Sequence, residues 1–197
     1  MENKIKLHDK TFRVLIPAEE IDNAVTRVAE QLNERYEGRT PIFLGVLSGS
    51  FLFLADLVRK VNFENQLAFV KISSYNGTES TGNVKQLIGV DFDIEGRDII
   101  IVEDIVDSGM TLSFLKENLL SRGAASLKIV TLLDKPERRR VDIHADYVGA
   151  SVPDEFIVGY GLDAGSNHAL LGDLLQCSIT YEAGHRELAE LGCVLLE

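Results

Sequence analysis

Residues 99–111 constrain the fold of this chain more than any other segment, because an apolar run there passes through acidic residues into the start of a helix. The β-branched run 99–102 is typical of a strand buried in a parallel sheet, and a Ser-Gly turn commonly precedes a helix. Three carboxylates lie between the two: Glu103, Asp104 and Asp107. Ligands of open α/β sheets bind at the carboxyl ends of the strands. The segment therefore predicts a ligand site at that edge of an α/β sheet.

The rest of the chain continues the alternation of strands and helices, which favours a mostly parallel sheet flanked by helices. Apolar periodicity predicts helices over residues 18–36, 51–58 and 110–120, with further helical patterns at 170–175 and 186–191. Short apolar runs predict strands at residues 42–47, 66–73, 98–102, 127–133, 147–149 and 156–159. No repeat or linker separates these segments, so we expect one α/β domain over residues 1–197.

The charge balance limits the partners of this domain. The 197 residues include 20 lysines and arginines against 31 aspartates and glutamates, so the formal net charge is −11. Such a field repels nucleic acid and anionic lipid, and no apolar stretch is long enough for a membrane span. Two cysteines are too few for a disulfide scaffold, and the first ten residues lack the apolar core of a signal peptide. We expect a cytoplasmic protein that binds neither nucleic acid nor membranes.

The acidic segment and the helix start make complementary demands on a ligand. Four residues form the helix start: Ser108, Gly109, Met110 and Thr111. Their backbone N–H groups and two hydroxyls lie at the positive end of the helix, which binds phosphate. Glu103 and Asp104 instead accept hydrogen bonds from hydroxyls or hold a divalent cation. A phosphorylated sugar with Mg²⁺ meets both demands, whereas a simple helix cap at Asp107 or Ser108 would leave the cluster of carboxylates unexplained.

The run from Glu103 to Thr111 resembles the 5-phosphoribosyl 1-pyrophosphate (PRPP) binding motif of the type I phosphoribosyltransferases. Further runs resemble the bacterial hypoxanthine-guanine members of that family: 45–50, 73–75, 133–139 and 148–163. The resemblance implies the type I phosphoribosyltransferase fold, with a central sheet, a small hood region and a mobile loop. It also implies purine salvage, in which phosphoribosyl passes from PRPP to hypoxanthine or guanine and gives IMP or GMP and pyrophosphate.

The resemblance assigns the phosphoribosyl end of the site to residues at several strand ends. Glu103 and Asp104 are expected to hold the ribose hydroxyls and, together with Asp163, to bind Mg²⁺. Residues 108–111 are expected to surround the 5′-phosphate. The turn at Ser48 and Gly49 follows the first strand of the sheet and is expected to contact pyrophosphate through its backbone.

The resemblance assigns the purine end in the same way. Asp107 is expected to act as general base or proton acceptor at purine N7, and Lys135 to donate to the oxygen at C6, which favours 6-oxopurines over adenine. Phe156 is expected to stack on the base while the backbone of Ile157 contacts its edge. A solvated lysine and an ordinary core phenylalanine are the alternative interpretations of Lys135 and Phe156.

The stretch from Ser74 to Gln86 is rich in serine, threonine, glycine and asparagine, which predicts a mobile surface loop. By the resemblance, Ser74 and Tyr75 belong to a loop that closes over the site and excludes water from the cation-like transition state. A polar loop without function is the alternative.

The sequence departs from the family pattern at two places. Ser48 stands where the family usually has lysine, and residues 164–169 lack the aromatic residue and the arginine that follow Asp163 in the family. The tail from about residue 164 is therefore divergent.

These departures leave other functions open. A PRPP- or nucleotide-binding regulatory or sensor protein with weak or no catalysis would tolerate both changes. A phosphoribosyltransferase for another base, such as xanthine, is a further alternative. In either case the family resemblance implies a homo-oligomer, a dimer or a tetramer, with the apolar helix near residues 51–58 at an interface.

Overall fold

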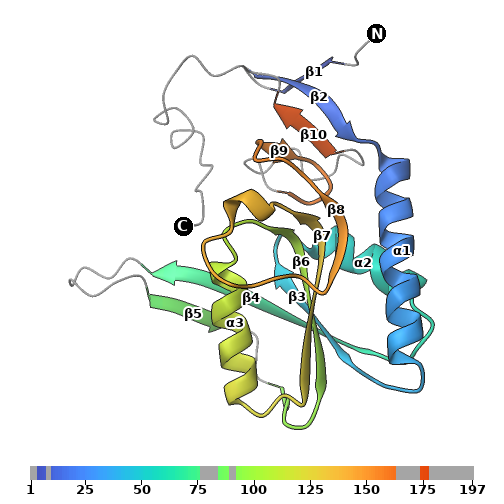
Figure 1. Cartoon of the computed structure of the whole chain (residues 1–197), viewed down its shortest axis with the longest axis vertical. Coiled ribbons are helices and arrows are strands. Elements are labelled where there is room, and N and C mark those ends of the chain that lie inside the picture. The colour runs from blue at the N-terminus through green and yellow to red at the C-terminus, as the bar shows by residue number, and fades with distance from the viewer. Residues whose placement is uncertain (1–3, 8–9, 76–83, 89–91, 163–173, 178–197) are drawn as a thin grey trace.

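The computed structural model describes residues 4–7, 10–75, 84–88, 92–162 and 174–177. A six-stranded sheet with the strand order β5-β4-β3-β6-β7-β8 forms its centre (Figure 1). The strands are β3 (Ile42–Leu47), β4 (Gln66–Tyr75), β5 (Val84–Ile88), β6 (Asp98–Val106), β7 (Ser126–Asp134) and β8 (Tyr147–Ser151). Five of them are parallel and β5 is antiparallel to β4, so the mostly parallel sheet is confirmed.

Strand β6 occupies the middle of the sheet because its apolar run can be buried on both faces. Residues 99–102 have no exposed surface. Ile99 pairs with Ile42 of β3 on one side and with Leu127 of β7 on the other. A continuous β-branched run is what a strand covered on both faces requires.

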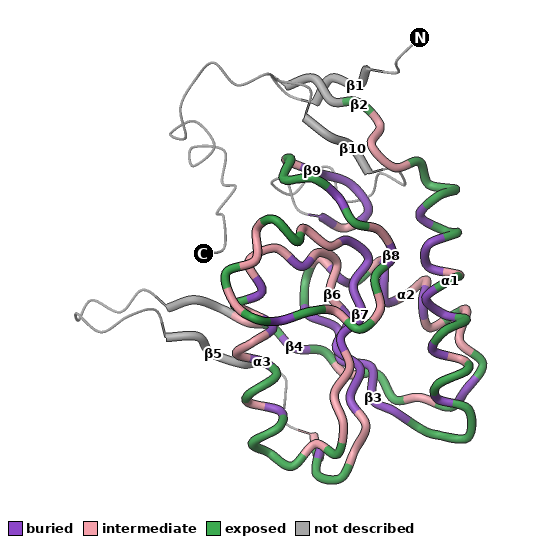
Figure 2. Tube along the Cα trace, viewed as in Figure 1, coloured by how far each residue is buried: buried purple, intermediate pink, exposed green. Residues whose placement is uncertain are grey.

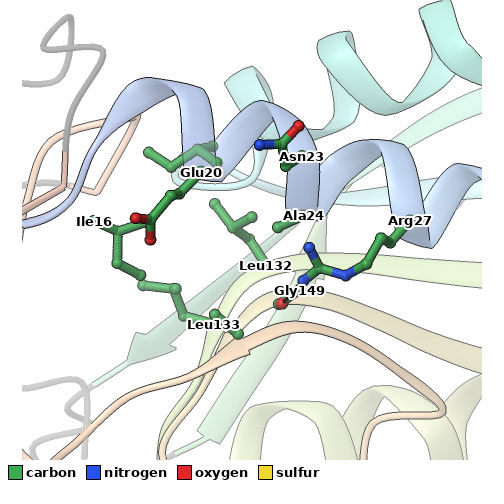
Figure 3. Close-up of a pocket in the computed structure, with 10 residues that line it drawn as sticks. Ile16, Glu20, Asn23, Ala24, Arg27, Leu132, Leu133 and Gly149 are labelled. Carbon is green, nitrogen blue, oxygen red and sulfur yellow. Dashed lines mark hydrogen bonds between the residues drawn. The ribbon is translucent and has the colours of Figure 1, made fainter.

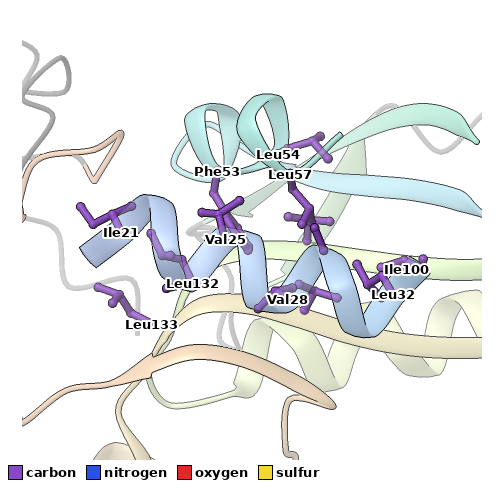
Figure 4. Close-up of a cluster of buried hydrophobic side chains, with 14 of the residues drawn as sticks. Ile21, Val25, Val28, Leu32, Phe53, Leu54, Leu57, Ile100, Leu132 and Leu133 are labelled. Atoms are coloured by element: carbon purple, nitrogen blue, oxygen red, sulfur yellow. The ribbon is translucent and has the colours of Figure 1, made fainter. Parts of the chain in front are cut away.

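Helices cover both faces of this sheet. Helices α1 (Ala18–Tyr36) and α2 (Phe51–Lys60) pack on one face and α3 (Met110–Ser121) packs on the other. Side chains of β6 alternate between the two layers: Ile100 lies in the α1 and α2 cluster (Figure 4), and Ile101 in the α3 cluster. Figure 2 shows the buried residues gathered along the central strands, with exposed ones on the outer turns of α1 and α3. The bounds of α1 are those that the periodicity predicts.

A smaller antiparallel sheet with the order β1-β2-β10-β9 lies at one end of the molecule (Figure 1). It consists of β1 (Lys4–Leu7), β2 (Lys10–Ile16), β9 (Ile157–Val158) and β10 (Leu174–Cys177). This sheet is the hood expected from the resemblance, and it brings β2, near the beginning of the chain, beside β10.

The helix predicted over 170–175 is wrong at its last two residues, because Leu174 and Leu175 belong to strand β10. Their partners are β2 and β9, which lie far away in the sequence. A short apolar run is compatible with either structure, and these distant partners decide between them. Residues 170–173 and the helix predicted over 186–191 lie outside the described residues.

The polar loop is shorter than its composition predicts. Ser74 and Tyr75 end strand β4, and they pair with Lys85 and Val84 of β5. Backbone pairing satisfies their peptide groups, so polar side chains do not prevent a strand here. Residues 76–83, between the two strands, lie outside the described residues. Among the described helices, none combines the length and the apolar character needed to cross a membrane.

Candidate active site

The acidic residues lie at the carboxyl end of the parallel strands, as predicted, but inside a strand rather than after it. Strand β6 continues four residues beyond the predicted end at residue 102. The cause is its pairing with β7, which joins Glu103 to Thr131 and Val106 to Asp134. Pairing with a neighbouring strand thus overrides the preference of carboxylates for exposed ends. It fixes Glu103 and Asp104 on a rigid backbone.

Burial sets the charge state of these two carboxylates. Burial, with a smaller contribution from the neighbouring Asp104, raises the pKa of Glu103 well above its usual value. Burial also raises the pKa of Asp104 to about 6, and hydrogen bonds from backbone N–H groups oppose that rise. One of these runs from the N–H of Ile105 to Oδ1 of Asp104 over 2.8 Å. The pair therefore favours a proton, a hydroxyl donor or a cation nearby.

The second oxygen of Glu103 points to the same conclusion. Oε2 is buried and accepts no hydrogen bond within the described part of the chain. A buried carboxylate oxygen without a donor is costly, so a ligand or an ion that meets it gains binding energy.

The turn after β3 presses directly against Asp104. A Cβ added at Gly49 would lie 1.8 Å from Oδ2 of Asp104, so only glycine fits this position. A Cβ at Gly161 would lie 2.7 Å from the carbonyl oxygen of Gly49, which places a third segment against the same turn. Ser48, which precedes Gly49, is exposed and joined to Leu47 by a cis peptide bond. Gly49 therefore lies beside Asp104, and Ser48 precedes it in the same turn.

The helix start that follows β6 has the form of an anion site. Gly109 is the N-cap of α3 with a φ of +79°, and a Cβ there would lie 2.4 Å from Cγ2 of Ile143. The N–H of Met110 lies 3.4 Å from Oγ of Ser108, and Met110 and Thr111 form the first turn. The first N–H groups of a helix have no partner within the helix, so residues 108–111 can donate to a phosphate.

Asp107 lies between the acidic pair and the helix start, and two arginines hold it. Nε of Arg138 lies 2.7 Å from Oδ1 of Asp107. Arg139 donates to the backbone carbonyl of Asp107 and also pairs with Asp134. Neither arginine was among the predicted site residues. The run of three arginines after Lys135 is the signal that could have indicated them.

Lys135 lies next to Asp107 because its backbone N–H donates to the carbonyl of Val106 over 2.9 Å. Its side chain is only 11% exposed, and Nζ donates to the carbonyl of Glu155 over 2.7 Å. Burial lowers the pKa of Lys135, and the charges of Asp107 and Asp154 oppose that effect. Because its side chain is largely buried, the alternative interpretation of Lys135 as a solvated lysine does not fit the structure.

The purine end of the predicted site lies on the segment that leads into β9. Phe156 is half-buried and Ile157 is buried, and both directly follow Glu155, to which Lys135 is bonded. The structure therefore brings Lys135 to the segment that carries Phe156 and Ile157.

Some predicted site residues are not placed by the structure. Asp163 lies outside the described residues, and Ser74 and Tyr75 are described only by their backbone in β4. Within the described residues no three acidic, histidine or cysteine side chains form a metal-binding group. Mg²⁺ commonly binds through one or two carboxylates together with substrate phosphates, and Glu103 and Asp104 fit that mode.

A separate cavity of about 220 Å³ lies between α1 and the strands β7 and β8 (Figure 3). Glu20, Asn23 and Arg27 line it from the helix, and Leu132 and Gly149 from the strands. Arg27 already donates to the carbonyl of Gly149 over 2.9 Å. None of the predicted site residues lines this cavity, which lies on the α1 face of the sheet.

Comparisons with known proteins agree with this geometry. A family model described as a phosphoribosyl transferase domain matches residues 17–164. The hypoxanthine-guanine phosphoribosyltransferase of Lactococcus lactis is 49% identical over 157 residues, which are 79% of this chain and 85% of that protein. The bifunctional protein TilS/HprT of Listeria monocytogenes is 46% identical over 158 residues, or 80% of this chain. The chain spans about a quarter of the length of that relative, since the match covers 24% of it.

Solved structures give the same result. The crystal structure of a hypoxanthine-guanine phosphoribosyltransferase from Bacillus anthracis has a TM-score of 0.76 and 41% identity, over 83% of this chain and 96% of that one. A hypoxanthine phosphoribosyl transferase of Trypanosoma cruzi has a TM-score of 0.77 and 36% identity, over 88% of this chain and 94% of that one. That structure comes from a study of how the C-terminal region affects oligomeric state and enzymatic activity.

Proposed function

Because this chain belongs to the phosphoribosyl transferase family, we propose that it transfers phosphoribosyl from PRPP to hypoxanthine or guanine and releases pyrophosphate. One observation carries the proposal: a half-buried acidic pair adjoins a helix start suited to phosphate, and Lys135 lies against the segment of Phe156. Such a site offers distinct places for a sugar, a phosphate and a purine.

The acidic pair suits the sugar. Glu103 and Asp104 accept hydrogen bonds from the ribose hydroxyls, and their negative charge stabilises the positive charge that develops at C1 as pyrophosphate leaves. Residues 108–111 bind the 5′-phosphate through N–H groups and hydroxyls at the positive end of α3. Ser48 and Gly49 contact the pyrophosphate through the backbone of their turn.

The opposite end suits a 6-oxopurine. Lys135 donates to the oxygen at C6, Phe156 stacks on the ring, and the backbone of Ile157 contacts the edge of the base. When the ring nitrogen attacks C1, the base becomes more acidic, and Asp107 takes the proton from N7. A cationic donor at C6 disfavours the amino group of adenine.

We propose Mg²⁺ as the cofactor, held by Glu103 and Asp104 and by Asp163. When bound, the ion neutralises charge on the leaving pyrophosphate. The raised pKa values of Glu103 and Asp104 support this assignment, because a cation beside the pair would compensate their burial. Ser74 and Tyr75, at the end of β4, are proposed to begin the loop that covers the site.

The decisive experiment offers PRPP and Mg²⁺ with hypoxanthine, guanine, xanthine and adenine in turn. We expect IMP and GMP from the first two bases and little product from adenine. If no base yields a nucleotide while calorimetry shows that PRPP binds, the enzymatic proposal is wrong. Rapid turnover of xanthine alone would indicate a xanthine phosphoribosyltransferase.

A PRPP or nucleotide sensor on the same fold remains the second candidate. Ser48 in place of lysine and the absence of arginine from residues 164–169 favour it, because charge-assisted contacts to a leaving anion accelerate transfer. Binding of PRPP or GMP without turnover would support the sensor. A cytoplasmic location is proposed for either function.

A further inference from the structure

Two consecutive arginines hold different parts of Asp107. Arg138 is the last residue of the 3-10 turn η1 (Pro136–Arg138), and Arg139 follows it directly. Arg139 donates to the backbone carbonyl of Asp107, while Nε of Arg138 lies 2.7 Å from Oδ1 of its side chain. The turn after β7 therefore fixes both the backbone and the carboxylate of the proposed proton acceptor.

The other end of the Arg138 guanidinium reaches a second segment. Its Nη1 lies 3.4 Å from Oδ1 of Asp154, in the loop between β8 and β9. Asp154 precedes Glu155, which accepts from Lys135, and Phe156, which is proposed to stack on the base. Arg138 thus connects the loop that carries the proton acceptor to the loop that carries the base-binding residues.

Stability is a poor explanation for these two contacts. The side chain of Arg138 is 30% exposed, that of Asp107 38% and that of Asp154 47%. The pair with Asp154 is open to water, and such pairs contribute little to the free energy of unfolding. In Asp107 the oxygen that faces Arg138, Oδ1, is buried and has no hydrogen-bond partner among the described residues, so the exposed part of the side chain lies elsewhere. Proton transfer, in contrast, depends strongly on where a carboxylate oxygen points, because transfer requires hydrogen-bond reach. With Oδ1 facing Arg138, the second oxygen Oδ2 can face N7 of the base.

We propose that Arg138 is a positioning residue for transfer to the purine, which orients the carboxylate of Asp107 and couples it to the base-binding loop through Asp154. The inference rests on the proposed role of Asp107 and deepens it. The planar guanidinium makes the two contacts with two different nitrogens, which the single ammonium of a lysine cannot reproduce.

Steady-state kinetics on the full chain with hypoxanthine and PRPP test this role. Arg138→Gln is expected to lower kcat about tenfold, with the KM for PRPP changed less than about twofold and the melting temperature unchanged. Arg138→Lys keeps the charge but not the two-pronged geometry, so its kcat should lie between those of Arg138→Gln and the wild type. Asp154→Asn removes the second contact of Arg138 together with the longer ion pair, 3.9 Å, between Asp154 and Nζ of Lys135, and should lower kcat about threefold.

Arg140→Gln is the matched control, because it removes one positive charge from the same turn at an exposed side chain. It should behave as the wild type. A second control uses Asp107→Asn: in that background Arg138→Gln should cause no further loss of kcat, since the carboxylate that it orients is gone.

The outcomes separate this proposal from the one on which it rests. Wild-type kcat in Arg138→Gln, an equal loss in Arg140→Gln, or a melting temperature that falls together with kcat would each overturn the role of Arg138. Full turnover by Asp107→Asn would instead overturn the role of Asp107. Absence of turnover in the wild type would overturn both.

Discussion

Glu103 and Asp104 are held in surroundings that oppose their ionisation. Asp104 has a usual pKa of 3.8, and burial raises it to about 6 in the folded chain. Between pH 3.8 and pH 6, Asp104 is therefore protonated in the folded state and ionised in the unfolded state. The stabilisation from this group is complete below pH 3.8 and is lost as the pH rises through 6. At neutral pH the carboxylate costs stability, which fits its proposed role in binding a ligand or an ion.

Asp104→Asn should therefore be more stable than the wild type at pH 7.5, by about 1–2 kcal/mol in the absence of ligands, and nearly inactive. The advantage should shrink as the pH falls below 6, because the wild-type carboxylate then becomes neutral as well. Denaturant unfolding of both proteins at pH 5, 6 and 7.5 measures this difference. Glu64→Gln is the control, since Glu64 is exposed and its substitution should leave the free energy of unfolding nearly unchanged at all three pH values.

The carboxylate of Asp104 leaves no room for a side chain at Gly49. Gly49→Ala places a Cβ 1.8 Å from Oδ2 of Asp104, so the turn or the acid must move. We expect a loss of about 1–3 kcal/mol in the free energy of unfolding and weaker binding of PRPP. Ser48→Ala, at the exposed neighbouring position, should leave the free energy of unfolding unchanged. If Gly49→Ala binds PRPP as the wild type does, the turn is not part of the site.

The segment after β9 is fastened to helix α2 by one buried tyrosine. Tyr160 is 8% exposed, and its hydroxyl donates to Oδ2 of Asp56 over 2.5 Å. Burial and the bond to Asp56 raise the pKa of Tyr160, so it stays neutral in the folded chain well above pH 10. The contact joins the segment after β9 to helix α2.

Tyr160→Phe should lower the free energy of unfolding by about 1 kcal/mol, because it removes this hydrogen bond and leaves the carboxylate of Asp56 without it. The loss should diminish above pH 10, where the unfolded tyrosine ionises and the wild type is destabilised. Chemical unfolding at pH 8 and pH 10.5 measures both effects. Tyr147→Phe is a suitable comparison, since Tyr147 is half-buried in the same core cluster, and equal losses would argue against a specific role for the bond to Asp56.

The molecule as a whole exposes apolar side chains on the face that carries α2. Leu67 is 51% exposed and Phe69 is 38% exposed on β4, and Phe51 is 56% exposed at the start of α2. The neighbouring residues of β4 point into the α3 cluster instead, so Leu67 and Phe69 lie on the face towards α2. A second copy of the chain could cover this surface, and the expected homo-oligomer would use it.

Leu67→Glu combined with Phe69→Glu should shift the protein to a smaller assembly in sedimentation or light scattering. Leu120→Glu makes a comparable change on α3, where Leu120 is 46% exposed on the opposite face, and should not change the mass. Since each chain carries a net charge of −11, association should also weaken at low salt. An unchanged mass in the double variant would assign the interface to another surface.

Local patterns in the sequence were sufficient to predict those elements whose side chains follow a clear periodicity or motif. The helical spacing of apolar residues predicts the bounds of α1, because one face of that helix packs on the sheet and the other faces solvent. The continuous apolar run at residues 99–102 predicts β6, because both faces of that strand are buried. The order of acids, Ser-Gly turn and helix start predicts the proposed anion site, since backbone N–H groups at a helix start need no distant partner.

Tertiary structure decided what depends on residues remote in the sequence. Strand β10 forms because β2 and β9 pair with it, and β6 extends through Glu103 and Asp104 because β7 lies alongside. Distant segments also account for the raised pKa values of the acidic pair, which come from burial. They likewise account for the contacts of Arg138 with Asp107 and Asp154. Burial and contact between distant segments exist only once the chain has folded, because they depend on which segments the fold brings together.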